Sequence, residues 1–415
     1  MEYIPRVADA ELAARLARSG AVLVEGAKGC GKTELAARVA RSQVRVDTDP
    51  NVSALLDVDP ALVLAGATPR LIDEWQWQPT LWNHIRRAVD DRKAPGQFIL
   101  TGSATPDPTV RRHSGAGRFS VMRLRPMSLW ELGRSTGEVS WQDLRGGRRV
   151  AAAPSSLGID QVAELVVRGG WPAMARRPTA DARDYVLDYL DLLAEADMGQ
   201  ADGVRRNPVR VKRLLASLGR NTATDASIAT LTKDTAGAGA PFNRDTVASY
   251  LEALNRLMIA EDQPAWSPAL KDSATPRKTP KRHLVDPSLA AAAMGATPAK
   301  LVLEPKTLGS LFESLVVRDL RVYSAAQRGQ VFYYRDSAGR ELDAIVAYPD
   351  GWVACEIKLG TGSIDRAADN LKAVTAKIDT QTTGLPDALV VITATSAGYQ
   401  RRDGVRVVPA SALRP

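Results

Sequence analysis

The sequence predicts a multidomain α/β protein with three parts: a parallel sheet wrapped by helices, a largely helical middle, and a smaller α/β domain at the end. Over residues 1–132, short β-rich runs alternate with helical stretches, which is the pattern of a parallel sheet covered by helices. Residues 159–300 show mainly helical periodicity. After Leu308 the pattern becomes helix, strand, hairpin, helix and strand, which indicates a second α/β domain.

The length supports this division, because 415 residues exceed what one hydrophobic core usually serves. The composition, 45% hydrophobic and 25% charged, is that of an ordinary globular protein. Residues 133–158 are rich in Gly, Ser, Arg and Ala, so we expect a linker there. The predicted domains are therefore residues 1–132, 159–300 and 301–415.

No apolar run approaches the ~20 residues that span a bilayer, and the amino terminus lacks the basic and then apolar pattern of a signal peptide. We therefore expect a cytoplasmic protein without a membrane partner. The two cysteines, Cys30 and Cys355, are too few for a disulfide framework or a cysteine-built zinc site. The three histidines are too far apart in sequence to define a metal site or a Ser-His-Asp arrangement.

The net charge of +8, with a pI near 9.5, favours contact with a polyanion such as DNA or RNA. The same charge spread over a chain of this length also fits a solvated surface. Charge alone leaves both interpretations open.

A glycine-rich loop follows the first predicted strand, Ala21–Glu25, and precedes a helix. Its glycines let backbone N–H groups converge on phosphates at the positive end of that helix. Lys32 would reach the β- and γ-phosphates, and Thr33 would bind Mg²⁺. The sequence therefore predicts a site for ATP and Mg²⁺ formed by Gly26, Ala27, Lys28, Gly29, Cys30, Gly31, Lys32 and Thr33.

Two more predicted strands, Arg70–Asp73 and Phe98–Thr101, end in polar residues, and a fourth covers Val44–Asp47. Asp73 would orient Mg²⁺ through water and Glu74 would polarise the attacking water, as in a Walker B motif. The alternative is a strand end whose acids only meet solvent. Thr101 or Ser103 would sense the γ-phosphate if the strands are adjacent, and a simple Thr-Gly-Ser turn is the alternative.

These motifs resemble those of prokaryotic AAA-type ATPases that carry a carboxy-terminal domain of unknown function. The resemblance spans nearly the whole chain and includes the runs Gly115–Arg118, Leu124–Leu132, Gly169–Pro172 and Lys281–Pro287. It implies that Arg118 is an arginine finger, acting in its own subunit or in a neighbour's. The alternatives are a surface arginine or a nearby one (Arg111, Arg112 or Arg123). Many such ATPases form rings, which leaves a homo-oligomer open, although no helix here carries a self-association signature.

Residues 209–266 suggest a winged helix, with two helical patterns and a loop rich in Gly and Ala before Asn243. Asn243 is a plausible N-cap, and one helical face is apolar: Val247, Leu251, Leu254 and Met258. The outward side, with Arg244, Ser249 and Arg256, suits a groove-binding helix or packing against another domain. The loop residues Lys271, Arg277, Lys278, Lys281 and Arg282 are candidates for phosphate contacts, and a solvated face is the alternative.

Residues 341–358 form a predicted β-hairpin around a Pro-Asp-Gly turn. Centring the turn between Pro349 and Asp350 places Asp343 opposite Glu356 and Glu341 opposite Lys358. Strand alternation then puts these four on one face and the following on the other: Leu342, Ala344, Val346, Val353, Cys355 and Ile357.

Carboxylates opposed this closely repel each other unless a positive group lies between them. A hard cation, Mg²⁺ or Mn²⁺, held by Asp343 and Glu356 would relieve the repulsion, with Lys358 assisting a water or a phosphate. This arrangement resembles the PD-(D/E)xK nuclease superfamily, and Glu313 resembles the acidic residue of its first helix. The alternatives are ion pairs of Glu341 with Lys358 and of Asp343 with Arg335 or Arg340, or a domain that binds nucleic acid without cutting it.

Together these features predict ATP hydrolysis with Mg²⁺, coupled to binding or processing of nucleic acid, most simply DNA. One alternative is a nucleotide-controlled metal-dependent nuclease. Another is a switch that binds ATP and recruits a protein partner without hydrolysing ATP.

Overall fold

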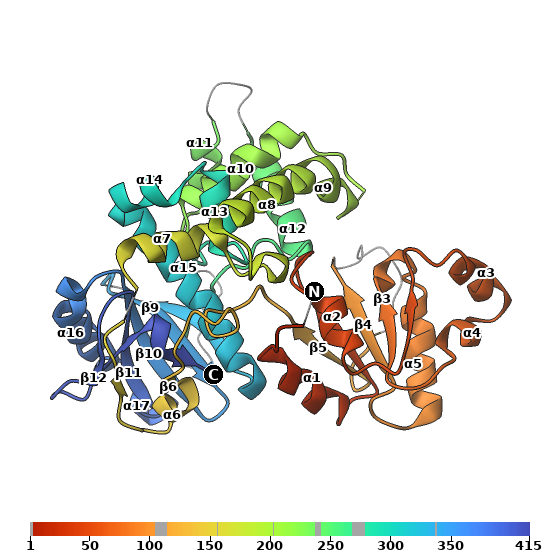
Figure 1. The fold of residues 1–415 in the computed structure, drawn as a ribbon, viewed down its shortest axis with the longest axis horizontal. Coiled ribbons are helices and arrows are strands. Elements are labelled where there is room, and N and C mark those ends of the chain that lie inside the picture. Colours follow the sequence, from red (N-terminus) through yellow and green to blue (C-terminus); the bar gives the residue numbers. More distant parts are fainter. Residues whose placement is uncertain are drawn as a thin grey trace. The chain divides into compact units, whose positions relative to one another are not determined.

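The computed structural model describes residues 3–103, 114–155, 157–201, 203–236, 242–267, 279–336 and 338–415 (Figure 1). The chain forms two compact units. The amino-terminal unit comprises residues 1–126, 195–206 and 252–259, and the carboxy-terminal unit comprises residues 127–194, 207–251 and 260–415.

The sheet of the amino-terminal unit has five parallel strands in the order β2-β3-β4-β1-β5. These strands are β1 (Ala21–Glu25), β2 (Ser42–Arg45), β3 (Arg70–Asp73), β4 (Phe98–Gly102) and β5 (Phe119–Arg123). The prediction of a parallel sheet is confirmed, and β5 is a strand that the sequence pattern did not reveal. Because β4 lies between β1 and β3, the polar end of β4 is adjacent to the glycine-rich loop and to the Asp73 strand.

Helices cover both faces of this sheet, because alternate residues of its buried strands point to opposite sides. On one face, Val22 and Val24 of β1 pack with α1 (Ala8–Leu16) and α2 (Lys32–Ala37). On the other, Ala21 and Leu23 pack in a cluster that includes residues of α3 (Asn51–Val58), α4 (Pro60–Leu64) and α5 (Leu81–Arg92).

The middle of the chain is helical, as predicted. It contains α7 (Ile159–Arg168), α8 (Thr179–Leu192), a π-helical turn (Leu193–Asp197), α9 (Met198–Gln200), α10 (Pro208–Arg220), α11 (Ile228–Asp234), α12 (Arg244–Arg256), α13 (Pro287–Ala293) and α14 (Pro298–Leu303). Asn243 accepts a hydrogen bond from Thr246 N at 2.7 Å, and the predicted apolar face of α12 is buried. Two segments after α12 meet through antiparallel bridges, Ala260 with Leu284 and Gln263 with Lys281.

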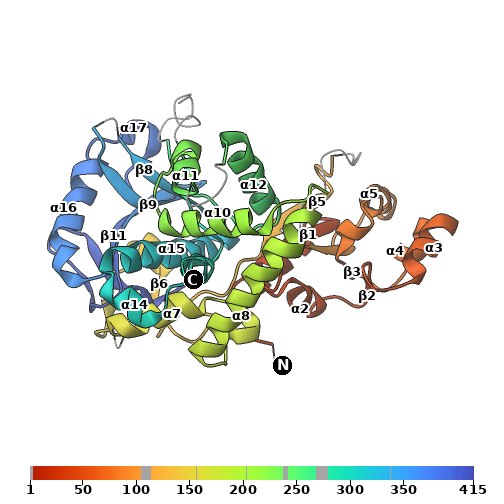
Figure 2. The same cartoon turned by 90° about the horizontal axis from the view of Figure 1, so that it is seen from above.

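The carboxy-terminal unit contains a seven-stranded sheet in the order β7-β12-β13-β11-β10-β9-β8. Its strands are β7 (Ala151–Ala152), β8 (Gln330–Arg335), β9 (Glu341–Tyr348), β10 (Gly351–Lys358), β11 (Ala388–Thr393), β12 (Gly398–Gln400) and β13 (Arg406–Pro409). α16 (Ile364–Thr375) packs on one face and α15 (Pro305–Ser324) lies on the other (Figures 1 and 2). The predicted order of helix, strand, hairpin, helix and strand is therefore present.

The segment predicted as a linker, residues 133–158, contains regular structure instead. It forms β6 (Val139–Ser140), α6 (Trp141–Arg145) and β7, and these strands pair with β14 (Leu413–Arg414) and with β12. Trp141 Nε1 donates to the Tyr348 hydroxyl at 2.6 Å. Its Gly-rich and Arg-rich composition hid this role, because two-residue strands at a sheet edge carry no readable periodicity.

A helix that crosses a membrane needs a long apolar run, and no helix within the described ranges has one.

Candidate nucleotide site and carboxylate cluster

The glycine-rich loop links the end of β1 to the start of α2, as predicted. Gly29 and Gly31 have φ angles of 74° and 99°, a left-handed conformation that glycine adopts without steric cost. A Cβ at Gly26 would lie 2.2 Å from the carbonyl oxygen of Leu124. The loop conformation therefore depends on glycine at these positions.

Lys32 lies inside the loop and is only 5% exposed. Its Nζ donates to the carbonyl oxygens of Gly26 and Ala27 at 2.9 and 3.0 Å. The ammonium is thereby held against the loop that would cradle phosphates, which is the position that a phosphate-binding lysine requires.

Asp73 brings the loop and the two neighbouring strand ends together. Its Oδ1 accepts a hydrogen bond from the Thr33 hydroxyl at 2.9 Å and a shorter one from the Thr101 hydroxyl. Asp73 is 6% exposed and Thr101 is fully buried. Two hydroxyls, one from α2 and one from β4, therefore converge on one carboxylate oxygen at the end of β3. Carboxylate and hydroxyl oxygens are hard donors, so this set fits Mg²⁺ held directly or through water.

Glu74 follows β3 in a left-handed conformation, with φ of 55°. Its N–H donates to the Thr101 hydroxyl at 3.3 Å, and its carboxylate accepts from Ser103 Oγ at 3.1 Å and from Gln76 Nε2. Gln76 Oε1 is buried and lacks a hydrogen-bond partner within the described part of the chain. An acceptor oriented this way beside Glu74 fits a water molecule as donor. The two sensor candidates thus separate, since Thr101 contacts Asp73 and Ser103 contacts Glu74.

Other loop contacts were not visible in the motif. Lys28 Nζ forms an ion pair with Asp197 at 2.6 Å. Arg6 is 7% exposed and donates to the carbonyl oxygens of Cys30 and Arg125 at 3.0 and 2.7 Å. Arg6 therefore fastens the loop backbone, and no sequence pattern distinguishes it from the many other arginines.

Arg118 lies at the end of the sheet away from the loop. β5 runs parallel to β1 with Phe119 opposite Ala21 and Arg123 opposite Glu25. At ~3.3 Å per residue, a five-residue strand separates Arg118 from the loop end by roughly 16 Å. Its Nε pairs with Asp90 at 2.6 Å.

Arg118 therefore does not act as an arginine finger on its own subunit's loop, and a role toward a neighbouring subunit stays a prediction. Arg123 is the alternative at the loop end of β5. Arg111 and Arg112 lie outside the described residues.

The two tryptophans after Glu74 differ. Trp75 is 1% exposed and its ring centroid lies 5.2 Å from that of Trp82, so it packs in the core. Trp77 is 59% exposed, so a packing role, which its place beside the Asp73 strand would suggest, does not hold for this residue. The side chain lies at the end of a 3₁₀ turn, Trp75–Trp77, which turns it away from the core.

The hairpin of β9 and β10 has the predicted register, with Tyr348 opposite Gly351 and Ala344 opposite Cys355. The predicted faces are only partly correct. Between β8 and β9 the pairing shifts by one residue, from Phe332 with Ile345 to Tyr334 with Leu342. Leu342 consequently shares a core cluster with Ile345 rather than a face with Ala344 and Val346, because one extra residue reverses the alternation.

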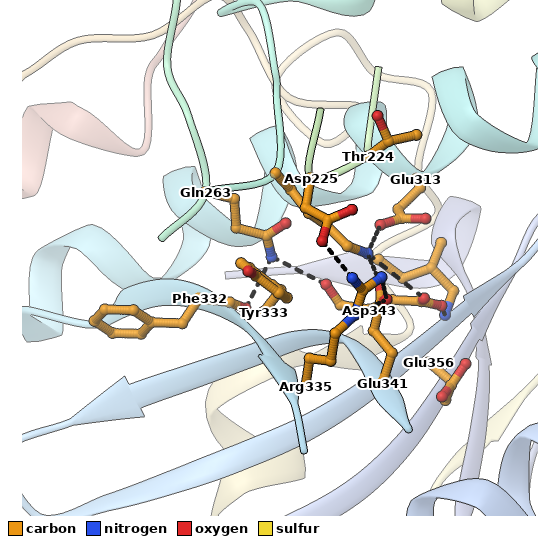
Figure 3. A network of polar contacts seen from close by, with 12 residues as sticks. Thr224, Asp225, Gln263, Glu313, Phe332, Tyr333, Arg335, Glu341, Asp343 and Glu356 are labelled. Carbon is orange, nitrogen blue, oxygen red and sulfur yellow. Dashed lines mark hydrogen bonds and ion pairs between the residues drawn. The ribbon is translucent and has the colours of Figure 1, made fainter. Parts of the chain in front are cut away.

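Three of the predicted acidic residues meet at a lysine that was expected in an exposed loop. Lys281 Nζ lies 2.7 Å from Glu313, 2.6 Å from Glu341 and 3.9 Å from Asp343. Figure 3 shows Glu313, Glu341 and Asp343 gathered in one place. We call Glu313, Glu341, Asp343 and Glu356 the carboxylate cluster.

The prediction of a phosphate contact is therefore wrong for Lys281, and also for Arg282, since both are buried and paired with acids. Lys271, Arg277 and Lys278 lie outside the described residues.

Lys358 completes the cluster from β10. Its Nζ contacts Asp343 at 2.7 Å and Glu356 at 2.5 Å, and Asn370 donates to Glu356 at 2.6 Å. The expected alternative pairs are wrong in detail. Arg335 pairs with Glu341 at 2.6 Å, and Arg340 pairs with Asp336 at 3.0 Å.

Burial governs the protonation of the cluster. Burial and the charge of Asp343 raise the pKa of Glu313 to about 8 and that of Glu356 to about 7. Burial disfavours the charged form of Lys281, but Glu313, Asp343 and Glu341 outweigh it and raise the pKa of this ammonium. Lys281 therefore stays charged.

As arranged, the cluster does not fit a divalent cation, because the Lys358 ammonium lies between Asp343 and Glu356 and the Lys281 ammonium contacts Glu313 and Glu341. No group of three or more acidic, histidine or cysteine side chains in the described ranges is arranged to hold a metal. The oxygen atoms around Asp73 therefore suit a divalent cation, whereas the arrangement at Asp343 and Glu356 does not.

The remaining motifs meet in a buried network with a structural role. Asp286 accepts from Gly170 N at 3.0 Å and from Arg318 Nη1 at 2.8 Å, and Arg318 also pairs with Asp319 at 2.7 Å. Gly169 is left-handed, and a Cβ there would lie 2.3 Å from Ser288 Oγ. The runs Gly169–Pro172 and Lys281–Pro287 therefore hold the helical region to α15.

Comparisons with known proteins match three segments of the chain to protein families. Residues 18–133 match the family described as an AAA domain. The amino-terminal segment is thus a P-loop domain of the AAA type. Residues 159–300 and 308–413 match two domains of unknown function, DUF8612 and DUF4143.

Two similar proteins, described as uncharacterized, come from Mycobacterium bovis and Mycobacterium tuberculosis. Each is 28% identical over 369 residues, which cover 87% of this chain and 76% of the relative. A Walker-type ATPase of Pyrococcus abyssi aligns with 70% of this chain and 96% of its own, at 12% identity and a TM-score of 0.40. A Vibrio cholerae protein aligns over 94% of both chains at 10% identity and a TM-score of 0.18.

Proposed function

We propose that the protein binds ATP with Mg²⁺ at the Gly26–Thr33 loop and hydrolyses it. The observation that carries the proposal is the convergence of the Thr33 and Thr101 hydroxyls on one oxygen of Asp73. Bound Mg²⁺ would neutralise charge on the β- and γ-phosphates. Thr33 and Asp73 hold the ion, and Lys32 contributes a fixed positive charge inside the loop.

Glu74 is the residue that activates water in this proposal. Ser103 and Gln76 fix its carboxylate, while Thr101 ties its backbone to Asp73. A change at the phosphate end of the site is thereby transmitted to the residue that orients the water, which is what a sensor requires.

ATP turnover by purified protein tests the proposal. Lys32→Ala should abolish turnover and weaken ATP binding, whereas Glu74→Gln should abolish turnover and retain binding. Glu34→Gln, an exposed acid on α2, is the matched control and should leave both unchanged. Turnover of the intact protein no higher than that of Lys32→Ala would instead favour a switch that binds ATP without hydrolysing it.

We also propose that the helical region couples ATP to nucleic acid. Support comes from the order of α10, α11 and α12 followed by two antiparallel bridged segments, which is the order of a winged helix. A hollow of about 490 Å³ lies beside the start of α12 and is lined by Arg244, Thr279 and Arg282 among others. Arg244 is exposed, so it is the residue best placed to contact a phosphate.

Fluorescence anisotropy with a labelled duplex, with and without ATP, tests this coupling. Arg244→Glu should weaken binding and flatten its salt dependence, because a phosphate contact releases counterions. The charge-matched control Arg366→Glu lies on an exposed position of α16 and should have no effect. Equal binding by both variants, or no binding by the unaltered protein, would remove nucleic acid from the proposal.

A further inference from the structure

Lys281 is a buried cation with three acidic neighbours. Its side chain is 3% exposed, and Glu313 and Asp343 are 14% and 13% exposed. Glu313 comes from α15, while Glu341 and Asp343 come from β9. A positive group among acidic side chains compensates their repulsion, and here that group is an ammonium of the same chain.

The segment that carries Lys281 is fastened to the carboxy-terminal sheet through its backbone and its neighbours. The Tyr333 hydroxyl donates to the carbonyl oxygen of Thr279 at 2.6 Å. His283 Nδ1 lies 3.0 Å from Ser314 Oγ on α15, and Gln263 donates to the carbonyl oxygens of Phe332 and Asp343 at 2.8 and 3.0 Å. The position of the ammonium is therefore set by the docking of the whole segment, not by a flexible side chain.

The other positive charges of the cluster are already committed. Lys358 bridges Asp343 and Glu356. Arg335 pairs with Glu341 and also with Asp225 (Figure 3). Lys281 pairs with Glu313 at 2.7 Å. Without Lys281 the acids of α15 and β9 would face each other with too little positive charge.

We propose that Lys281 is a built-in cation that takes the place of a divalent metal ion among Glu313, Glu341 and Asp343, so that the protein does not bind a metal there while this lysine is in place. An ammonium and a hard divalent cation seek the same carboxylate oxygens, so the two exclude each other. The inference does not depend on ATP hydrolysis.

Mn²⁺ binding to the nucleotide-free full-length chain, measured by electron paramagnetic resonance, tests this role of Lys281. Lys281→Met keeps the length of the side chain and removes its charge, and it should gain one Mn²⁺ per chain. The double variant Lys281→Met with Asp343→Asn should lose that ion again. Lys372→Met is the matched control, because Lys372 also bridges two acids, Asp369 and Asp403, on the surface, and it should gain none.

Two results would overturn the proposal. One is an Mn²⁺ ion bound by the unaltered protein that disappears with Asp343→Asn, since the cluster would then be open while Lys281 is present. The other is folded Lys281→Met protein that gains no Mn²⁺. Thermal unfolding adds a second readout, in which Mn²⁺ should raise the Tm of Lys281→Met and leave that of the unaltered protein unchanged.

Amine acetylation of the unaltered protein keeps the proposal testable if Lys281→Met does not fold. Lys281 should react at least about tenfold more slowly than the exposed Lys306, because reagent reaches it only after local opening. Glu341→Gln removes one carboxylate at the rim of the cluster and should reduce the difference in acetylation rate between Lys281 and Lys306. Equal acetylation rates of Lys281 and Lys306 in the unaltered protein would show that Lys281 is not held among the acids of the cluster, and would overturn the proposal.

Discussion

Replacing Thr101 with valine removes one hydroxyl from the centre of the nucleotide site without changing the volume of the side chain. That hydroxyl donates to Asp73 Oδ1 and accepts from Glu74 N at 3.3 Å, and Thr101 is fully buried. The substitution therefore uncouples Asp73 from Glu74 and leaves the Glu74 N–H without its acceptor.

The magnitude follows from these two contacts. A hydrogen bond to a charged group contributes about 1.5–3 kcal/mol, and a buried donor left unsatisfied costs about 1–3 kcal/mol. We therefore expect Thr101→Val to lower the free energy of unfolding by about 2.5–6 kcal/mol. Because misplacement of a catalytic group by 1 Å reduces rates by about a hundredfold, kcat should fall by about that factor while KM for ATP changes little.

Steady-state ATP turnover measures the effect, at a temperature where urea unfolding shows the variant to be folded. Thr375→Val is the control, because this buried hydroxyl of α16 donates only to carbonyl oxygens of its own helix, including Leu371 O at 2.7 Å. It should cost about 1 kcal/mol and leave kcat unchanged. A folded Thr101→Val protein with a kcat within about twofold of the unaltered protein would refute the assigned coupling.

Three more predictions concern the packing and the charges. Arg318→Met leaves Asp286 and Asp319 buried without their cation and should lower the free energy of unfolding in urea by about 3–5 kcal/mol. Arg401→Met on the surface is the control and should lower it by about 0–1 kcal/mol. Similar losses for both variants would contradict the buried network. Trp75→Ala should cost about 3–5 kcal/mol and Trp77→Ala within about 0.5 kcal/mol, and a large loss with Trp77 would mean that its ring is packed. The pKa of Glu313 rises from 4.5 to about 8 on folding, so the folded state holds the extra proton and this group lowers stability as pH rises from about 4.5 to 8. In urea unfolding at a series of pH values, Glu313→Gln should remove that decline of the free energy of unfolding with pH. An unchanged slope of this free energy against pH would show that Glu313 titrates normally.

Much of the nucleotide site was predictable because its information is local. The loop Gly26–Thr33 requires glycines at fixed spacing, and the buried strands that end in Asp73 and Thr101 are short apolar runs with a polar last residue. The hairpin register around Pro349 and Asp350 was predictable for the same reason, since a turn fixes the pairing of the strands beside it. From the sequence alone, it had to be assumed that β4 lies next to β1 and β3. The order of the strands in the sheet established it.

The motif chemistry, the secondary structure of the long elements and the amphipathic face of α12 could thus be predicted from the sequence alone. The charge pairs could not. Arg118 lies at the far end of β5, residues 139–152 pair with strands near the carboxy-terminal end of the chain, and Lys281 enters the cluster of Glu313, Glu341 and Asp343. The physical reason is that an ion pair needs its partners close in space, and the docking of whole segments sets that distance, whatever their separation along the chain.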